Sequence, residues 1–327
     1  MQLGIFAKVF VRPTLEQSLD AVAAHGLTCV QFNMVTAGLA PLPQHIAPEL
    51  CDRIRRAMAA RRITMAAVSG TFNMSHPDPE HRRAGLERLR VLAAACHRLG
   101  TSVITLCTGT RDPQDMWASH PDNRTPEAWR DMVATVREAV AVAEQAEVTL
   151  AFEPEVANVV DSAPKGRRLL DEIGSSRLKV VMDGANLFHA GQLPRMREVL
   201  EEAFALLSRD VVLAHAKDLS RDGEAGQEAA GFGLLDYDLY LALLGRDVAA
   251  IAPVADRARG LGVGVEVVAC DVTDADACAA AVSRTLAAFG GRIDVLVNNA
   301  GGPGPIGKTG TETTPDEFDD IVRLNMR

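Results

Sequence analysis

The chain has 327 residues, enough for one large or two ordinary domains, and 47% of them are hydrophobic, so a sizeable core is expected. Its 34 basic and 43 acidic residues give a formal charge of −9. This charge speaks against nucleic acid as a partner, because binding a phosphate backbone needs a basic surface. No apolar run approaches the roughly 18 residues of a membrane span, and no secretion signal is recognisable. The six cysteines are scattered without a Cys-x-x-Cys pair, and most are expected to be small buried hydrophobic residues. A cytoplasmic protein is predicted.

Short apolar runs alternate with amphipathic stretches up to about residue 245. Fully apolar runs indicate strands buried on both faces, and their alternation with helices is typical of a parallel sheet. Thr14 with Gln17, and Thr125 with Pro126, are helix-start signals. We count seven strand–helix units, one fewer than a closed (β/α)8 barrel has. The predicted strands are Gln2–Ala7, Leu27–Phe32, Ile63–Val68, Val103–Cys107, Val148–Phe152, Leu178–Met182 and Val211–Ala214, and the predicted helices include Pro48–Arg61, Pro79–Leu99, Pro126–Ala146 and Tyr237–Leu244.

Three polar residues close the last three of these strands: Glu153, Asp183 and His215. They lie 30 and 32 residues apart, and one unit of a (β/α)8 barrel averages roughly 31 residues. The three side chains are therefore expected at the carboxyl ends of successive strands, where such barrels carry their chemistry. Two carboxylates and an imidazole are suitable ligands for a divalent metal. The pattern predicts a metal site.

The amino-acid composition of the chain changes near Arg246, and Ala, Val and Gly are frequent after it. We therefore expect a first domain at 1–246, a TIM-type barrel lacking its normal eighth strand, and a second, smaller α/β segment at 247–327. No fourth metal ligand follows the seventh unit. A less favoured arrangement would bring Asp271 to the barrel mouth as a substitute. The predicted elements of the second segment are strands at Val248–Ala252, Val265–Cys270 and Ile293–Val297 and a helix at Asp274–Phe289.

Several segments of the first domain carry a resemblance to a known family; they are SGTFNMSHPD (69–78), TLCTGTRDP (105–113), FEPE (152–155), MDGANLFHAG (182–191) and HAKDL (215–219). With them the chain resembles the sugar-phosphate isomerase/epimerase superfamily of xylose-isomerase-like TIM barrels. The resemblance implies a divalent metal, manganese, magnesium, cobalt or zinc, held by Glu153, Asp183 and His215. The family's fourth ligand, a glutamate on strand eight, has no counterpart here.

The second segment contains ACDVTD (269–274), DVLVNNAGG (294–302) and Asn325. With these motifs it resembles the interior of a short-chain dehydrogenase/reductase, and the resemblance implies a partial Rossmann-like α/β segment at 247–327. The resemblance implies adenine contact for Asp271, support of the cofactor by Asn298, Asn299, Ala300 and Gly301, and membership of the catalytic tetrad for Asn325. The glycine-rich loop and the Tyr-x-x-x-Lys motif of that family are absent. The site is therefore interpreted as vestigial, and NAD(P) is not expected to bind.

Some further polar residues are candidates for the barrel mouth. His189, six residues after Asp183, is predicted as a catalytic or outer contact, with a plain loop histidine as the alternative. For Glu155 a site role competes with a turn role. For His76 a structural role is slightly favoured. Lys217 and Asp218 would either orient His215 and bind substrate or form a solvated loop pair.

The leading interpretation is a metal-dependent isomerase or epimerase acting through an enediolate on a small sugar, sugar phosphate or hydroxy-keto acid. Glu153 is the best candidate for the base that takes the carbon-bound proton. One alternative is an NAD(P)-dependent oxidoreductase of the short-chain type, and another is a non-catalytic chimeric or truncated product. Endonuclease chemistry is a weaker alternative, against which the acidic charge speaks. Unpaired strand edges would favour association of two copies.

Overall fold

The computed structural model describes residues 2–246, 275–288 and 290, and the chain divides into two compact units at 1–240 and 241–327. The first unit contains one sheet of seven parallel strands paired in chain order. Six of the seven predicted strands agree with the structure to within two residues at each end, whereas the first is confined to two residues because a 3-10 helix begins at Ala7. The strands are β1 (Ile5–Phe6), β2 (Cys29–Phe32), β3 (Thr64–Ser69), β4 (Val103–Cys107), β5 (Thr149–Glu153), β6 (Leu178–Asp183) and β7 (Val211–His215).

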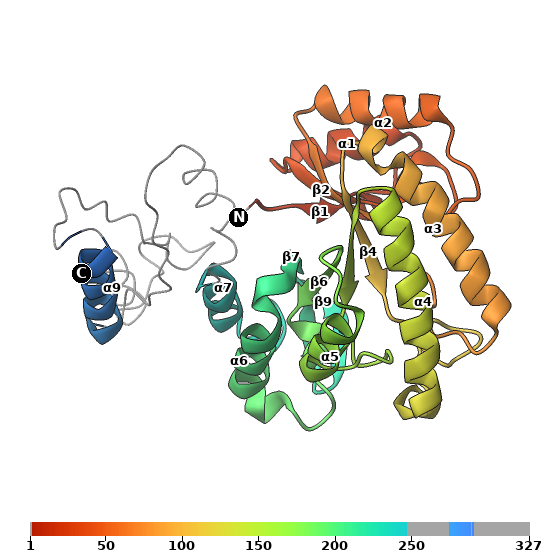
Figure 1. Ribbon diagram of the computed structural model, residues 1–327. Coiled ribbons are helices and arrows are strands. Elements are labelled where there is room, and N and C mark those ends of the chain that lie inside the picture. The colour runs from red at the N-terminus through yellow and green to blue at the C-terminus, as the bar shows by residue number, and fades with distance from the viewer. Residues whose placement is uncertain (1, 247–274, 289, 291–327) are drawn as a thin grey trace. The chain divides into compact units, whose positions relative to one another are not determined.

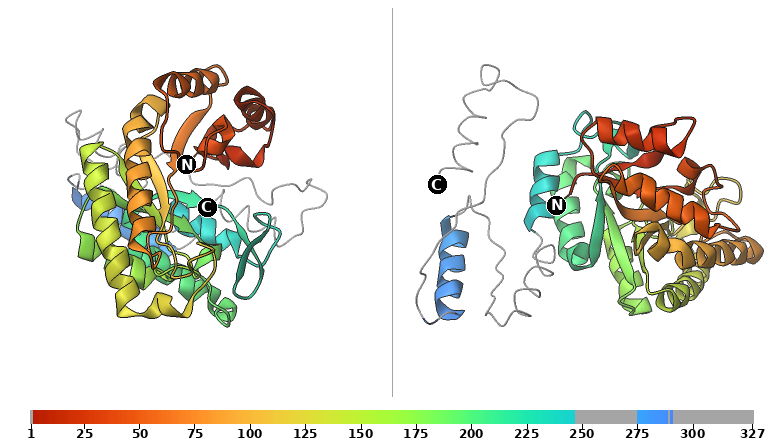
Figure 2. Two further views of the ribbon diagram at one scale, coloured as in Figure 1. Left: turned by 90° about the vertical axis from the view of Figure 1, so that its right-hand side faces the viewer. Right: turned by 90° about the horizontal axis from the view of Figure 1, so that it is seen from above.

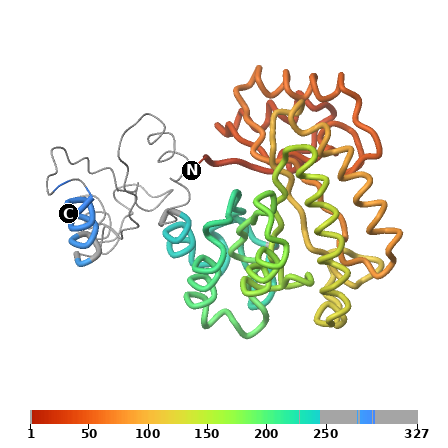
Figure 3. Tube along the Cα trace, viewed as in Figure 1, coloured from red at the N-terminus to blue at the C-terminus, as the bar shows by residue number. Residues whose placement is uncertain are grey.

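Helices cover the outer side of this curved sheet, so the unit has the architecture of a TIM-type barrel, as predicted (Figures 1 and 2). The colour of the tube in Figure 3 follows the chain in order around the sheet. Among the described residues, β1 and β7 share no ladder hydrogen bonds. The main helices are α1 (Leu15–Ala24), α2 (Pro48–Ala59), α3 (Pro79–Leu99), α4 (Pro126–Gln145), α5 (Ala163–Ile173), α6 (Met196–Leu207) and α7 (Tyr237–Arg246).

Local sequence signals set the helix ends. Thr14 Oγ1 accepts from the backbone N–H of Gln17, and Thr125 Oγ1 accepts from that of Ala128, as expected for N-cap residues. Packing explains why a glycine stands inside α3, because a Cβ at Gly85 would lie 2.1 Å from the Phe72 ring. No helix within the described ranges has the length and apolarity needed to cross a membrane.

Two features lie outside the repeating units. A two-stranded antiparallel hairpin, β8 (Asp218–Arg221) and β9 (Glu224–Glu228), follows β7 and was not predicted. Its two-residue turn places Gly223 at φ +75°, which favours glycine. In the second unit the structure describes α9 (Ala275–Ala288), in agreement with the predicted helix at Asp274–Phe289. The three strands predicted in that unit lie outside the described residues.

Candidate metal centre

Glu153, Asp183 and His215 are the last residues of β5, β6 and β7. Parallel pairing places Asp183 directly beside His215, so the carboxyl ends of these strands meet at one edge of the sheet. One ligand atom from each of the three side chains lies within 4.8 Å of the others. His215 Nδ1 is 3.1 Å from Glu153 Oε2 and 3.9 Å from Asp183 Oδ2. The convergence expected from the spacing is present.

The orientation of the His215 ring is set from β2. His215 Nε2 donates to Gln31 Oε1 at 2.8 Å. The Gln31 amide cannot turn freely, because its Nε2 donates to Ser69 Oγ at 2.9 Å and to Thr105 Oγ1 at 2.8 Å. The Phe6 ring packs against the imidazole with centroids 5.0 Å apart. Nδ1 therefore faces the two carboxylates while Nε2 is held by the amide.

Glu153 and Asp183 differ in their electrostatics although both belong to the same cluster. Burial and the charge of Glu153 raise the pKa of Asp183, which is 2% exposed, to about 7. Burial would also raise the pKa of Glu153, but the hydrogen bond and charge of His215, with Lys217, lower it below its ordinary value. Burial acts to lower the pKa of His215, but the hydrogen bond and charge of Glu153 raise it overall.

The donor set fits a divalent cation. Two carboxylates and one imidazole are crowded into a largely buried space, and burial together with the charge of Glu153 raises the pKa of Asp183, so a cation would stabilise the ionised carboxylates. Lys217 Nζ at 3.4 Å from Asp183 Oδ2 offsets only part of this negative charge. Imidazole nitrogen and carboxylate oxygen are ligands that Mn²⁺, Co²⁺ and Zn²⁺ accept.

The cluster lies in a cavity of about 710 Å³ whose lining includes residues of both border strands of the sheet, β1 and β7. Burial and the charge of Glu153 raise the pKa of Glu155, a lining residue, to about 7. Trp117, which is 54% exposed, also contributes to the wall. The cavity can therefore accommodate a small polar molecule beside the three candidate ligands. Its polar lining includes Lys8, Gln31, Asn33, Ser69, Thr105, Glu153, Glu155, Asp183, Asn186, His215 and Lys217.

Comparison with known proteins agrees with this architecture. The model of the family "xylose isomerase-like TIM barrel" matches residues 19–250. The chain belongs to this family. A model of the short-chain dehydrogenases matches residues 226–327, so both resemblances seen in the sequence are confirmed. No curated protein sequence matches the chain.

Solved structures share the fold at low identity. The IolI protein with a bound zinc atom is 16% identical (TM-score 0.57), and the alignment covers 75% of this chain and 84% of that one. A xylose isomerase domain protein from Planctomyces limnophilus is 17% identical (TM-score 0.55; 79% and 95% covered). The apo 3-keto-D-glucoside 4-epimerase YcjR from E. coli is 14% identical (TM-score 0.57; 76% and 88% covered).

Two site residues of this xylose isomerase-like barrel were missed in the sequence. Gln31 stands in the β2 run without a motif to distinguish it. Asn186 follows Asp183 by three residues, within the segment MDGANLFHAG, which was a usable signal. Asn186 Nδ2 donates to Glu153 Oε1, and Asn186 Oδ1 accepts from Lys217 Nζ at 2.6 Å. The amide thus connects a candidate ligand to the lysine.

The two histidines considered for the barrel mouth lie elsewhere. His189 Nε2 is 4.0 Å from Asp161 Oδ2, and neither His189 nor His76 is among the residues that line the cavity. The catalytic role predicted for His189 therefore has no support from its position. His76 is 8% exposed and accepts from the backbone N–H of Asp78 at 3.0 Å, while His81 packs edge-on against it. The slight preference for a structural His76 agrees with this placement.

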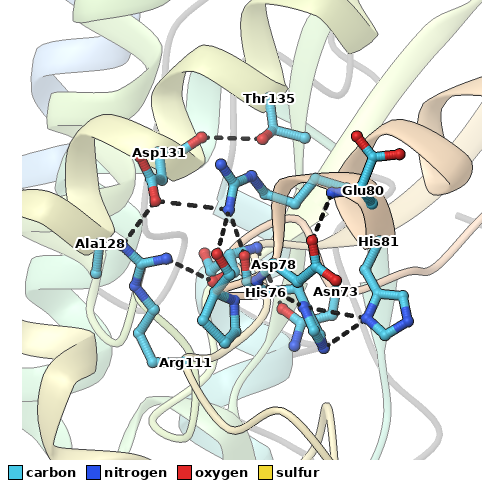
Figure 4. A network of polar contacts seen from close by, with 12 residues as sticks. Asn73, His76, Asp78, Glu80, His81, Arg111, Ala128, Asp131 and Thr135 are labelled. Carbon is cyan, nitrogen blue, oxygen red and sulfur yellow. Dashed lines mark hydrogen bonds and ion pairs between the residues drawn. The ribbon is translucent and has the colours of Figure 1, made fainter.

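Figure 4 shows the polar network around His76, which ties the loop after β3 to the loop after β4 and to α4. Arg111, from the β4 loop, donates to Asp131 Oδ2 at 2.8 Å and to the backbone of Ser75 at 3.3 Å. Arg82 lies 3.5 Å from the same Asp131 oxygen. These contacts join the loop after β3, the loop after β4 and α4.

The pair Lys217–Asp218 divides into two roles. Lys217 lines the cavity, whereas Asp218 is 0% exposed and accepts four backbone N–H groups of the segment 219–235. The alternative of a solvated pair is therefore wrong for Asp218, because its buried carboxylate is hydrogen-bonded to four backbone amides. The residues of the dehydrogenase-like site, namely Asp271, Asn298, Asn299, Ala300, Gly301 and Asn325, lie outside the described residues.

Proposed function

We propose that the chain is a divalent-metal-dependent isomerase or epimerase of a small sugar, sugar phosphate or hydroxy-keto acid. The observation that supports this most is the meeting of Glu153, Asp183 and His215 at the carboxyl ends of three neighbouring strands, inside a cavity. Membership of the xylose isomerase-like barrels, whose fold IolI and YcjR share, supports the same class of chemistry. In this proposal residues 1–246 form the barrel domain and 247–327 the dehydrogenase-like segment.

A divalent cation held by Glu153, Asp183 and His215 would polarise a neighbouring carbonyl–hydroxyl pair of the substrate. Glu153 is the proposed base, because its lowered pKa keeps it ionised at neutral pH. It takes the proton from the carbon next to the carbonyl and leaves the substrate as an enediolate. Asn186, which donates to Glu153, holds this carboxylate in place. Glu155, which also lines the cavity, is the proposed second proton-transfer group and returns a proton to the substrate.

Hydrogen exchange on carbon tests the proposal directly. The full chain is loaded with Mn²⁺, its metal content is measured, and a panel of ketoses and ketose phosphates in D₂O is followed by NMR. We expect metal-dependent deuterium incorporation next to the carbonyl, which Glu153→Gln abolishes. His76→Ala is the control, since His76 does not line the cavity, and should keep the activity. A metal-loaded chain that exchanges no carbon-bound proton of any substrate would contradict the proposal.

An oxidoreductase function is the second candidate, because the short-chain dehydrogenase model matches residues 226–327. The sequence lacks the glycine-rich loop whose backbone N–H groups hold the cofactor pyrophosphate in that family. We expect titration calorimetry with NADH and NADPH to show no micromolar binding. Saturable binding in that range would favour this second function.

A further inference from the structure

Asn33, the residue that follows β2, has a buried side-chain oxygen without a hydrogen-bond partner among the described residues. Its relative exposure is 9%, and among the described residues its Oδ1 has no hydrogen-bond partner. A buried amide oxygen without a donor is unfavourable, so native proteins rarely leave one. Asn33 also lines the cavity that holds the candidate metal ligands.

The backbone explains why this side chain faces the cavity. Side chains alternate along an extended segment, so Asn33 lies on the same side as Gln31, whose amide reaches His215. Asn33 has extended dihedral angles (φ −117°, ψ 138°) that continue the strand direction. It therefore lies one step beyond Gln31, toward the carboxyl end of the barrel.

The Asn33 side chain does not cap the short helix that follows it. It is the N-cap residue of the 3-10 helix at Met34–Ala37, where an asparagine oxygen usually accepts a backbone N–H of the first turn. Here no side-chain capping bond forms, and the backbone N–H of Thr36 goes instead to the Asn33 carbonyl at 2.9 Å. Asn33 Oδ1 therefore has no hydrogen-bond donor among the described residues.

We propose that Asn33 is a substrate-binding residue whose Oδ1 accepts a hydrogen bond from a hydroxyl group of the substrate. This inference rests on the proposed function, because it concerns the molecule held beside Glu153, Asp183 and His215. An amide oxygen needs a donor, which a hydroxyl group supplies and an ionised phosphate or carboxylate does not. The group of the substrate that meets Asn33 Oδ1 is therefore a hydroxyl group.

The chain offers a matched control on the same short helix. Thr36 Oγ1 is likewise buried without a partner, but Thr36 does not line the cavity. Asn33→Ala and Thr36→Val each remove one unpartnered polar atom, and neither is expected to lower the melting temperature. Only the first removes a proposed substrate contact.

The test measures binding of xylitol, an uncharged acyclic polyol, to the Mn²⁺-loaded full chain by titration calorimetry. We expect Asn33→Ala to weaken xylitol binding about tenfold at unchanged metal content, and Thr36→Val to leave it unchanged. Equal binding by Asn33→Ala and the wild type would overturn the inference, as would a metal-loaded wild type that does not bind xylitol. A wild type that holds no metal would refute the proposed function and this inference with it.

Discussion

Removal of the charge of Asp218 should loosen the segment that follows β7. Asp218 Oδ1 accepts from the backbone N–H groups of Leu219 and Leu235, both at 2.8 Å, and Oδ2 accepts from those of Gly231 at 2.9 Å and Gly233 at 3.0 Å. Asp218→Asn keeps one oxygen, so one pair of N–H groups loses its acceptor. A hydrogen bond to a charged group contributes about 1.5–3 kcal/mol, so two lost bonds correspond to about 3–6 kcal/mol. Because the exposed part of the loop can relax, we expect the lower end of this range.

Amide hydrogen exchange on a peptide covering residues 218–236 measures this local free energy, and urea denaturation followed by circular dichroism measures the global one. The matched control is Asp222→Asn, since Asp222 also accepts two backbone N–H groups, from Gly191 at 2.6 Å and Leu193 at 3.2 Å, but at an exposed position. Water replaces exposed bonds, so the control should cost less than about 1 kcal/mol. If Asp218→Asn lies within about 0.5 kcal/mol of the wild type by both methods, the anchoring role of Asp218 is refuted.

Four further outcomes are expected. Burial would raise the pKa of Asp218, but its four backbone hydrogen bonds lower it below the ordinary value of 3.8. The stability that the Asp218 carboxylate contributes is therefore complete above pH 3.8 and is lost as the pH falls through the lower pKa of the folded state. The difference in unfolding free energy between the wild type and Asp218→Asn, measured with urea, should be constant at pH 5–8 and shrink below about pH 4. Asp183→Ala should reduce bound metal, measured by elemental analysis, more than His76→Ala does; equal contents would contradict the ligand assignment. Gln31→Leu should weaken metal binding about tenfold in a competitive chelator titration, because His215 loses its orienting acceptor. Cys107, whose thiol pKa is raised by burial, should resist iodoacetamide in the native protein, and its labelling without denaturant, seen by mass spectrometry, would contradict its burial.

The sequence predicted the strands and the convergence of the three candidate ligands, because both depend on local, repeating signals. Glu153, Asp183 and His215 each end an apolar run, and parallel strands of similar length place such ends at one edge of the sheet. The helix predicted from about Pro79 to Leu99 corresponds to α3, whose ends are set locally, because Asp78 caps its start and Gly100, at φ +98°, ends it. These features need no knowledge of distant contacts.

The parts that were missed depend on long-range geometry or on a signal left unused. The contact between Gln31 and His215 joins residues 184 positions apart, and only the curvature of the sheet brings them together. The hairpin at Asp218–Glu228 could have been predicted, since Asp222-Gly223 is a strong signal for a two-residue turn. His189 was assigned to the site by its distance along the chain from Asp183, but the loop after β6 carries it toward Asp161 instead.

His215 connects the two borders of the seven-stranded sheet as well as belonging to the candidate ligands. Among the described residues β1 and β7 are not joined by ladder bonds, yet at the carboxyl end the His215 ring contacts Phe6 of β1 and donates to Gln31 of β2. Side chains thus bridge the two borders at the level of the candidate site. The Gln31 amide accepts from Nε2, so a neutral His215 held this way presents the lone pair of Nδ1 to the carboxylates. The same hydrogen bond that spans the opening therefore also selects the histidine nitrogen available to a metal, which ties the geometry of the proposed centre to the approach of β2 and β7.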